Sequence, residues 1–194
     1  MRVNEIFYSI QGEGAKTGEA AIFLRFSGCN LRCEFCDTEH QPYKDLTEDE
    51  IAREIAKYKA NLVVITGGEP TLQLTESLID KIHELGKSVA IETNGTRQVP
   101  RNVDWVTVSP KSAFVGEVGK PIITKASEVK IVFDGKHHYS DPTFGIVAAH
   151  YYIQPCDTGD EEKNREIIEH CVQFIKDNPL WKMSLQTQKI LRVR

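Results

Sequence analysis

Apolar runs of strand length alternate with amphipathic helical stretches in the first half of the chain, and this order leaves few possible topologies. Residues 61–66, NLVVIT, form a continuous apolar run, which is typical of a parallel strand buried on both faces. A similar run at 20–27 precedes it, and 87–92 follows it. Strands that alternate with helices join through right-handed crossovers in a parallel sheet. The sequence therefore predicts an α/β fold.

The second half of the chain continues this order with shorter strands and fewer helices. About six mostly parallel strands with a reduced helix set predict a partial, open (β/α) barrel. We expect a single domain over residues 1–194. The expected strands here are 103–108, 128–133 and 146–153, one helix lies at 160–177, and the segments 112–126 and 134–145 are too broken for full helices.

Two helices are predicted between the first strands, and each has a recognisable end. A capping-box pattern opens the first at Thr47, and Gly86 is placed to end the second. Apolar residues recur on one face of both, and of the helix near the end of the chain. The residues expected to face inward are Ile51, Ile55 and Tyr58 in the first, Leu78, Ile82 and Leu85 in the second, and Ile167, Ile168, Cys171, Val172 and Ile175 in the last.

Polar and glycine-rich motifs stand where five of the predicted strands end. Ligands of open parallel sheets and partial barrels bind beyond the carboxyl ends of the strands. The five ends therefore predict one shared site, and together they are stronger evidence than any single motif. The motifs are the cysteine loop after 20–27, GGEP at 67–70, ETNG at 92–95, SPK at 109–111 and QPCD at 154–157.

The composition limits the setting in which such a site works. The chain has a net charge of −4 and no apolar run long enough to cross a bilayer. We therefore expect neither a nucleic-acid partner nor a membrane partner. Five cysteines, three of them within eight positions, argue against a disulfide framework and for a reducing cytoplasm. Cys156 and Cys171 are expected to be a loop thiol and a core thiol.

Cys29, Cys33 and Cys36 lie in the run GCNLRCEFCDT, with no fourth ligand close by. Three thiolates in one short loop hold a [4Fe–4S] cluster by three of its irons, and the fourth iron stays open to a small molecule. Such a cluster is suited to chemistry rather than to electron transfer alone. The two alternatives are a zinc site that recruits His40 as its fourth ligand and thiols that only pack.

Several polar residues near the strand ends have both a structural and a ligand-binding interpretation. Gly68 allows a ligand to approach the backbone closely, or only begins a helix. Glu69 can accept hydrogen bonds from an amine or favour the helix start, and Glu92 and Asn94 are equally open. The segment 11–14, QGEG, offers an amide and a carboxylate that match the donor and acceptor edge of a guanine-like or pterin-like ring, unless it is only a turn.

Two further positions concern charge at this site. Arg25 interrupts the apolar strand 20–27, and a buried cation needs a carboxylate or an anionic ligand. We favour an inward arginine that faces a carboxylate over a solvent-facing one. Asp37 and Thr38 follow the last clustered cysteine and offer oxygen ligands suited to Mg²⁺. The alternative there is a turn capped by Asp or Thr.

Taken in order, the motifs resemble those of a known enzyme family. The spacing CxxxCxxC followed by GGEP resembles the radical S-adenosylmethionine (SAM) superfamily. Seven motifs together are similar to those of 7-carboxy-7-deazaguanine synthases, enzymes of the queuosine and 7-deazapurine pathways. The motifs are IQGEG at 10–14, RFSGCNLRCEFCDT at 25–38, TGGEP at 66–70, ETNGT at 92–96, SPK at 109–111, QPCD at 154–157 and LQTQK at 185–189.

The resemblance implies a radical SAM lyase that cleaves a carbon–nitrogen bond. Its cofactors would be a [4Fe–4S] cluster, SAM and Mg²⁺, and a 5′-deoxyadenosyl radical would take a hydrogen atom from 6-carboxy-5,6,7,8-tetrahydropterin. Ring contraction and loss of ammonia would then give 7-carboxy-7-deazaguanine. The family also implies a flavodoxin as the electron donor and a homodimer.

The resemblance further implies roles for individual residues. Cys29, Cys33 and Cys36 would hold the cluster, and Thr38 would bind Mg²⁺. The implied cofactor-binding residues are Gly68, Glu69, Glu92, Asn94, Ser109, Pro110, Lys111, Gln154, Pro155, Cys156 and Asp157. The implied substrate-binding residues are Ile10, Gln11, Gly12, Glu13, Arg25, Thr66, Gln188 and Arg194.

The C-terminal tail departs from the family pattern. Gln188 stands where a histidine is common, and the chain ends at Arg194 where a proline is common. The terminal carboxylate can still accept hydrogen bonds from the pterin amino group. The tail therefore carries the weakest part of the resemblance.

Two other functions are open to a chain with these cysteines. An activating enzyme that makes a glycyl radical on a partner protein also uses CxxxCxxC, although IQGEG and CDT speak against it. The length also leaves no room for an extra ferredoxin-type domain. A non-catalytic iron–sulfur or zinc protein would only carry electrons or bind a partner.

Overall fold

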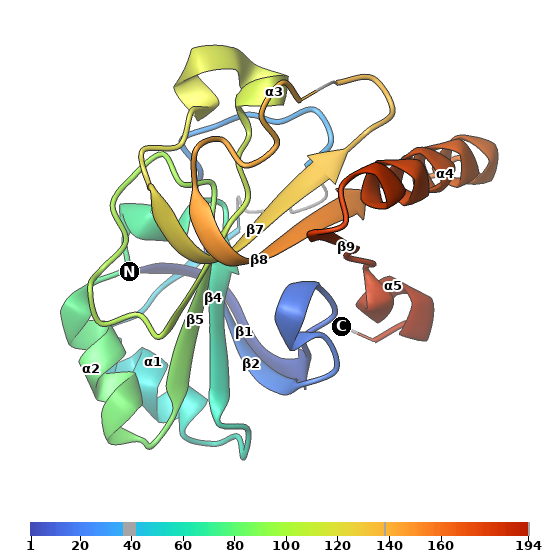
Figure 1. Ribbon diagram of the computed structural model, residues 1–194. Coiled ribbons are helices and arrows are strands. Elements are labelled where there is room, and N and C mark those ends of the chain that lie inside the picture. Colours follow the sequence, from blue (N-terminus) through green and yellow to red (C-terminus); the bar gives the residue numbers. More distant parts are fainter. Residues whose placement is uncertain (37–41, 138, 194) are drawn as a thin grey trace.

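The computed structural model describes residues 1–36, 42–137 and 139–193, and one sheet runs through it (Figure 1). The strands are β1 (Arg2–Ile10), β2 (Ala20–Phe26), β3 (Lys44–Asp45), β4 (Leu62–Gly67), β5 (Ser88–Thr93), β6 (Trp105–Val108), β7 (Lys125–Phe133), β8 (Val147–Pro155) and β9 (Trp181–Met183). Their order in the sheet is β3-β1-β2-β4-β5-β6-β7-β8-β9. β1 pairs antiparallel with β2 and β3, and all neighbours from β2 to β9 are parallel.

The predicted fold class is confirmed, because the sheet is mostly parallel and open. The six expected strands appear as β2 and β4 to β8. Three more strands extend the sheet, so the described residues contain nine strands rather than about six. β3 and β9 are only two and three residues long, too short to give a periodic signal. In β1, polar and charged side chains interrupt the apolar ones, and the sequence therefore predicts no strand there.

The helices begin and end largely where their local signals predict. They are α1 (Glu48–Ile55), α2 (Glu76–Glu84), α3 (Ser112–Val115), α4 (Glu161–Asp177) and α5 (Thr187–Leu191). The Glu50 N–H donates to Thr47 Oγ1 at 3.2 Å, and the Thr47 N–H donates to Glu50 Oε2 at 2.8 Å, which confirms the capping box. Gly86 follows α2 with φ at +71°, as predicted. Within the described residues, no helix combines the length and the apolarity that a bilayer crossing requires.

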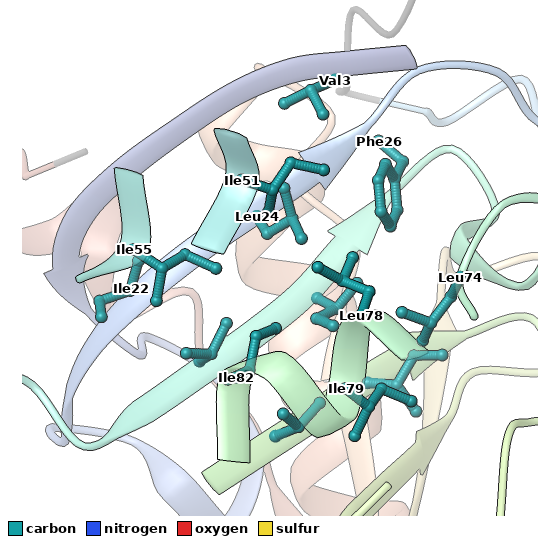
Figure 2. Close-up of a cluster of buried hydrophobic side chains, with 14 of the residues drawn as sticks. Val3, Ile22, Leu24, Phe26, Ile51, Ile55, Leu74, Leu78, Ile79 and Ile82 are labelled. Atoms are coloured by element: carbon teal, nitrogen blue, oxygen red, sulfur yellow. The ribbon is translucent and has the colours of Figure 1, made fainter. Parts of the chain in front are cut away.

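The larger apolar core lies between α1, α2 and the β2–β4–β5 part of the sheet (Figure 2). Full burial of each large aliphatic side chain stabilises the fold by about 1.5–3 kcal/mol. The predicted inward residues Ile51, Ile55, Leu78 and Ile82 are all fully buried here. This core fixes β2, β4 and β5, and with them the loops that follow their carboxyl ends.

Two residues predicted on these helix faces lie beyond the helices. Leu85 is 39% exposed, so its predicted inward orientation is wrong, and Ile79 fills the core instead. The reason is that α2 ends at Glu84, one residue before Leu85. Tyr58 also follows the end of its helix, although it packs half-buried against the core.

α4 packs on β8 and β9 with a narrower stripe than its sequence predicts. Ile167 and Cys171 are buried in a second apolar core, as expected, and Ile175 packs against it. Ile168 and Val172 are 40% and 39% exposed, so their predicted inward orientation is wrong. Covering one edge of the sheet leaves the flanks of this helix open to solvent.

Candidate active site

The parallel strands β2 and β4 to β8 end along one edge of the sheet, and a cavity of about 1100 Å³ opens there. This volume is slightly above the usual range of small-molecule sites, about 300–1000 Å³. The five strand-end motifs share this cavity, as predicted. The predicted site residues that line it are Ile10, Gln11, Gly12, Glu13, Arg25, Cys29, Cys33, Cys36, Thr66, Gly68, Glu92, Asn94, Ser109, Lys111, Gln154, Pro155, Cys156, Asp157 and Gln188.

A few predicted site residues are not found in the lining. Glu69 is fully buried, and Pro110 does not contribute to the cavity surface. Thr38 and Arg194 lie outside the described residues, and the roles predicted for them stay predictions. The other residues named as possible metal ligands, Asp37 and His40, lie outside the described residues as well.

The three clustered cysteines border the cavity from the loop that follows β2. The Leu31 N–H donates to Cys29 Sγ at 3.4 Å, and the Cys36 N–H donates to the Cys33 carbonyl at 3.2 Å. Burial raises the pKa of the Cys29 and Cys33 thiols, and the charges of neighbouring thiolates add to the rise. The Cys36 thiol is therefore close enough for its charge to act on both Cys29 and Cys33.

The donor set of this loop fits an iron–sulfur cluster. Each thiolate of a cluster binds a different iron, whereas a zinc ion gathers all its ligands around one point. In the part of the chain that the structure describes, no three Cys, His, Asp or Glu side chains are gathered closely enough to share one ion. All five cysteines are free thiols. A loop that presents three thiolates to one cavity fits such a cluster.

The end of β4 packs directly against the cysteine loop. A Cβ atom on Gly68 would lie 2.1 Å from the Gly28 carbonyl oxygen, far inside contact distance. The Glu69 N–H donates to the same carbonyl at 2.9 Å. The close approach that glycine permits here is thus made by the chain's own backbone, one residue before Cys29.

The buried Glu69 carboxylate joins the end of β4 to the end of β5. It accepts the Thr93 hydroxyl at 2.7 Å and the Asn94 N–H at 2.8 Å. Asn94 Nδ2 in turn donates to Asn30 Oδ1 at 3.0 Å, which links the ETNG motif to the cysteine loop. Three strand-end motifs are in this way held together by short hydrogen bonds.

Lys111 extends to the cavity from the SPK motif after β6. Its Nζ donates to the carbonyl and to the hydroxyl of Ser109, at 2.8 and 2.5 Å. Burial lowers the pKa of Lys111 to about 8, although the nearby Cys33 opposes this shift. A half-buried ammonium beside the cysteine loop favours negatively charged groups in this part of the cavity.

Arg25 lines the cavity and faces a carboxylate, as predicted. Its Nε donates to Glu5 Oε1 at 2.9 Å, and the two side chains are 21% and 24% exposed. The guanidinium lies 6.0 Å from the centre of the Phe7 ring, which stacks on Phe23. Glu5 comes from β1, so the sequence did not identify this partner. The partly exposed pair can still bind a further anion.

Glu13 is the centre of a second polar network at the cavity. Its Oε2 accepts the Lys130 ammonium in a short hydrogen bond. Lys130 Nζ also lies 3.7 Å from Glu92 Oε2, and Gln11 Nε2 donates to Glu92 Oε1 at 2.9 Å. Burial alone would raise the pKa of Glu13, but Lys130 lowers it to about 2. Glu13 is therefore a hydrogen-bond acceptor at any physiological pH.

The C-terminal tail closes over the QGEG motif. Gln186 Nε2 and Gln188 Nε2 each donate to Glu13 Oε1 at 3.1 Å. The Thr187 N–H and hydroxyl donate to the Gly12 carbonyl at 3.1 and 2.9 Å. Within the described residues, the buried Gln188 Oε1 has no hydrogen-bond partner. The predicted place of Gln188 beside the substrate motif is consistent with these contacts.

Sequence reasoning missed the charged residues of β7. Glu128 and Lys130 are 2% and 4% exposed, and both turn toward the Glu13 network. They alternate with the buried Val129 and Ile131, so one face of an otherwise apolar strand carries charge. That alternation was the available signal, because a strand with two charges on one buried face must pair them.

The chain matches the family model of the radical SAM superfamily over residues 24–116. It is 46% identical to a 7-carboxy-7-deazaguanine synthase of Bacteroides thetaiotaomicron, over 100% of this chain and 98% of the relative. A 7-carboxy-7-deazaguanine synthase of Haemophilus influenzae is 35% identical, over 97% of this chain and 92% of the relative. The first of these alignments therefore spans the whole chain.

Among solved structures, the fold is similar to that of QueE from Escherichia coli. The TM-score is 0.73 at 27% sequence identity, and the match covers 95% of this chain and 92% of the other. The similarity therefore covers nearly the whole chain and is not confined to the cysteine loop.

Proposed function

The chain belongs to the 7-carboxy-7-deazaguanine synthase family, and we propose how its own residues serve the reaction of that family. It is a radical SAM lyase that converts 6-carboxy-5,6,7,8-tetrahydropterin to 7-carboxy-7-deazaguanine and releases ammonia. Its cofactors are a [4Fe–4S] cluster, SAM and Mg²⁺. The observation that carries the proposed roles is that the three clustered thiols, Arg25 and Glu13 line one cavity.

The cysteine loop would hold the cluster by three irons, one for each of Cys29, Cys33 and Cys36. Held by these three thiolates and with SAM bound, the cluster would supply radical chemistry that removes a hydrogen atom from the substrate. The protein's part is to bind, orient and shield the reactants. The Asn30–Asn94 hydrogen bond and the packing of Gly68 on Gly28 would keep the loop in place.

We propose that the pterin binds between Arg25 and Glu13. A carboxylate on the substrate suits the Arg25 guanidinium. Amino and N–H donors on the ring suit the Glu13 carboxylate, which Lys130 keeps ionised. Gln188 lies beside Glu13 and donates to it at 3.1 Å. Thr38 would bind the Mg²⁺ that also holds the substrate carboxylate.

The remaining predicted substrate residues are Ile10, Gln11, Gly12, Thr66 and Arg194. For SAM, we propose the residues between the cysteine loop and β8. Lys111 supports this proposal, because its half-buried ammonium favours an anionic group such as the SAM carboxylate. The proposed cofactor-binding residues are Gly68, Glu69, Glu92, Asn94, Ser109, Pro110, Lys111, Gln154, Pro155, Cys156 and Asp157.

The setting and partners of the enzyme are proposals of the same kind. A flavodoxin as electron donor and a homodimer rest on the family resemblance. A cytoplasmic location fits the need of the cysteine loop for a reducing medium. One sheet with strands from residue 2 to residue 183 supports a single domain over 1–194.

The proposed function is tested by the product of anaerobic turnover. Reconstituted protein should contain about four iron and four sulfide per chain. With dithionite, SAM, Mg²⁺ and the tetrahydropterin, mass spectrometry should detect 7-carboxy-7-deazaguanine and ammonia should be released. Formation of 5′-deoxyadenosine without any deazapurine would mean that the substrate assignment is wrong. Bound zinc without labile sulfide would mean that the cluster assignment is wrong.

A further inference from the structure

Lys130 is a buried cation at a position that the family motifs do not include. Its side chain is 5% exposed, and it stands on β7, between the buried Val129 and Ile131. Burying an ammonium without partners costs several kcal/mol, so the groups around it must compensate. A purely apolar residue would fill this strand position at lower cost. The charge therefore needs an explanation in terms of its partners.

The partners of Lys130 come from two separate segments of the cavity wall. Glu13, in the segment after β1, accepts its short hydrogen bond, and Glu92, at the end of β5, lies 3.7 Å away. The Gln11–Glu92 hydrogen bond of 2.9 Å joins the same two segments. Lys130 thus keeps two carboxylates at a fixed separation, although without it they would repel each other.

Several charged groups of the described residues act on this ammonium. Glu13 and Glu92 contact it, and Glu128 of the same strand face and Lys111 act on it at longer range. Glu128 also accepts the Ala15 N–H at 2.9 Å. Among the described residues, Lys130 is therefore the cation that directly neutralises Glu13.

We propose that Lys130 is a positioning residue of the deazaguanine-forming reaction, which fixes the Glu13 carboxylate as the acceptor for the N–H edge of the pterin. This inference rests on the proposed substrate site. A protonated Glu13 carboxyl would direct its O–H donor at the N–H donors of the ring. A displaced Glu13 carboxylate would be too far away to accept hydrogen bonds from them. Lys130 prevents both, while its own Nζ is directed into the carboxylate pair.

The first test compares Lys130→Met with Lys130→Arg in reconstituted enzyme. We expect the methionine variant to raise the KM for the tetrahydropterin about tenfold to a hundredfold, with a much smaller change in kcat. The arginine variant should recover part of this loss. Lys125→Met, on the exposed start of the same strand, is the matched control and should behave as wild type.

The pH dependence separates positioning from a general structural role. Pairing with Lys130 holds the pKa of Glu13 near 2, so wild-type pterin binding should be constant from pH 6 to pH 8. Without the ammonium, burial raises the pKa of Glu13. Binding to Lys130→Met, measured anaerobically by titration calorimetry, should therefore weaken as the pH falls through this range. A structural defect would not reverse when the pH is raised.

The double variant Glu13→Gln with Lys130→Met guards against a misfolded single variant, because it removes both charges of the pair. It should bind the pterin weakly and without pH dependence. The inference is overturned if Lys130→Met has a wild-type KM and a flat pH profile. It is also overturned if the double variant binds the pterin like wild type. In both cases normal turnover by the wild-type enzyme would leave the proposed function intact. Failure of the wild-type chain to bind or convert the pterin overturns the function and this inference together.

Discussion

The two polar networks of the cavity are built in different ways. On what we call the cluster side, the motifs at 28–36, 67–69 and 93–96 are joined by backbone contact and by bonds among amides, hydroxyls and the buried Glu69. On the substrate side, residues 11–13, Glu92, Lys130 and the tail are joined by charges and by side-chain amides. Tight packing is insensitive to pH and salt, whereas charge pairs respond to both. We conclude that variants can damage either side without the other.

The largest effect should come from the cluster side. Cys33→Ala removes one of three thiolates, so we expect loss of the cluster and of all turnover. Iron and sulfide analysis after anaerobic reconstitution measures this directly. Cys171→Ala is the control, because that thiol is buried in the α4 core and should leave the iron content unchanged. Equal iron content in both variants would remove Cys33 from the ligand set.

A smaller but still severe effect is expected for Gly68→Ala. The added methyl carbon would lie 2.1 Å from the Gly28 carbonyl oxygen, so this backbone must move. The movement should lower the free energy of unfolding by about 1–3 kcal/mol and reduce the iron content. Gly18→Ala is the matched control. It meets no atom within 4 Å, and its positive φ adds strain of about 1–2 kcal/mol without touching the loop. Denaturant unfolding and iron analysis together separate the two, and full iron content in Gly68→Ala would contradict the packing argument.

On the substrate side, Arg25→Ala should keep the cluster but weaken pterin binding. Losing one charged hydrogen bond at a partly exposed guanidinium should raise KM about tenfold to a hundredfold. Glu5→Gln is the comparison variant, since it keeps the arginine and removes only its carboxylate partner. Steady-state kinetics should give a smaller change in KM for Glu5→Gln. A wild-type KM in Arg25→Ala would place the substrate carboxylate elsewhere.

The smallest effect should come from the edge of the tail. Lys189 Nζ lies 3.1 Å from Asp157 Oδ2, and the two side chains are 41% and 42% exposed. A surface pair contributes less than about 1 kcal/mol, so Lys189→Ala should change KM less than about fivefold. Repeating the kinetics in high salt should abolish even this difference. A large, salt-independent effect would mean that Lys189 itself contacts a ligand.

Local signals were enough to predict several elements in the first half of the chain. The capping box at Thr47, the glycine after α2 and the apolar run 61–66 each depend on near neighbours in sequence, and all three hold in the structure. Leu85, Ile168 and Val172 were misplaced, because periodicity gives a face but does not say where a helix ends or how wide its covered stripe is. β1 was missed because its polar residues serve the cavity.

The site was predicted in outline but not in its internal bonds. Glycine and cysteine motifs identify strand ends, and these converged in one cavity as expected. The bonds from Gln186 and Gln188 to Glu13 span more than 170 residues, at separations of 173 and 175, and no local pattern encodes them. Lys130 could be predicted only in part. Its alternation with apolar neighbours is visible in the sequence, whereas its partner Glu13 is not.

The separation of the two sides is tested most directly with Glu13→Gln in a single anaerobic assay. One measurement quantifies 5′-deoxyadenosine from dithionite-driven SAM cleavage without pterin, and 7-carboxy-7-deazaguanine when pterin is added. We predict that SAM cleavage proceeds at the wild-type rate, whereas deazaguanine formation falls at least about tenfold at subsaturating pterin. A parallel loss of both products would contradict the account, because it would show that the cluster side depends on the charge network of the substrate side.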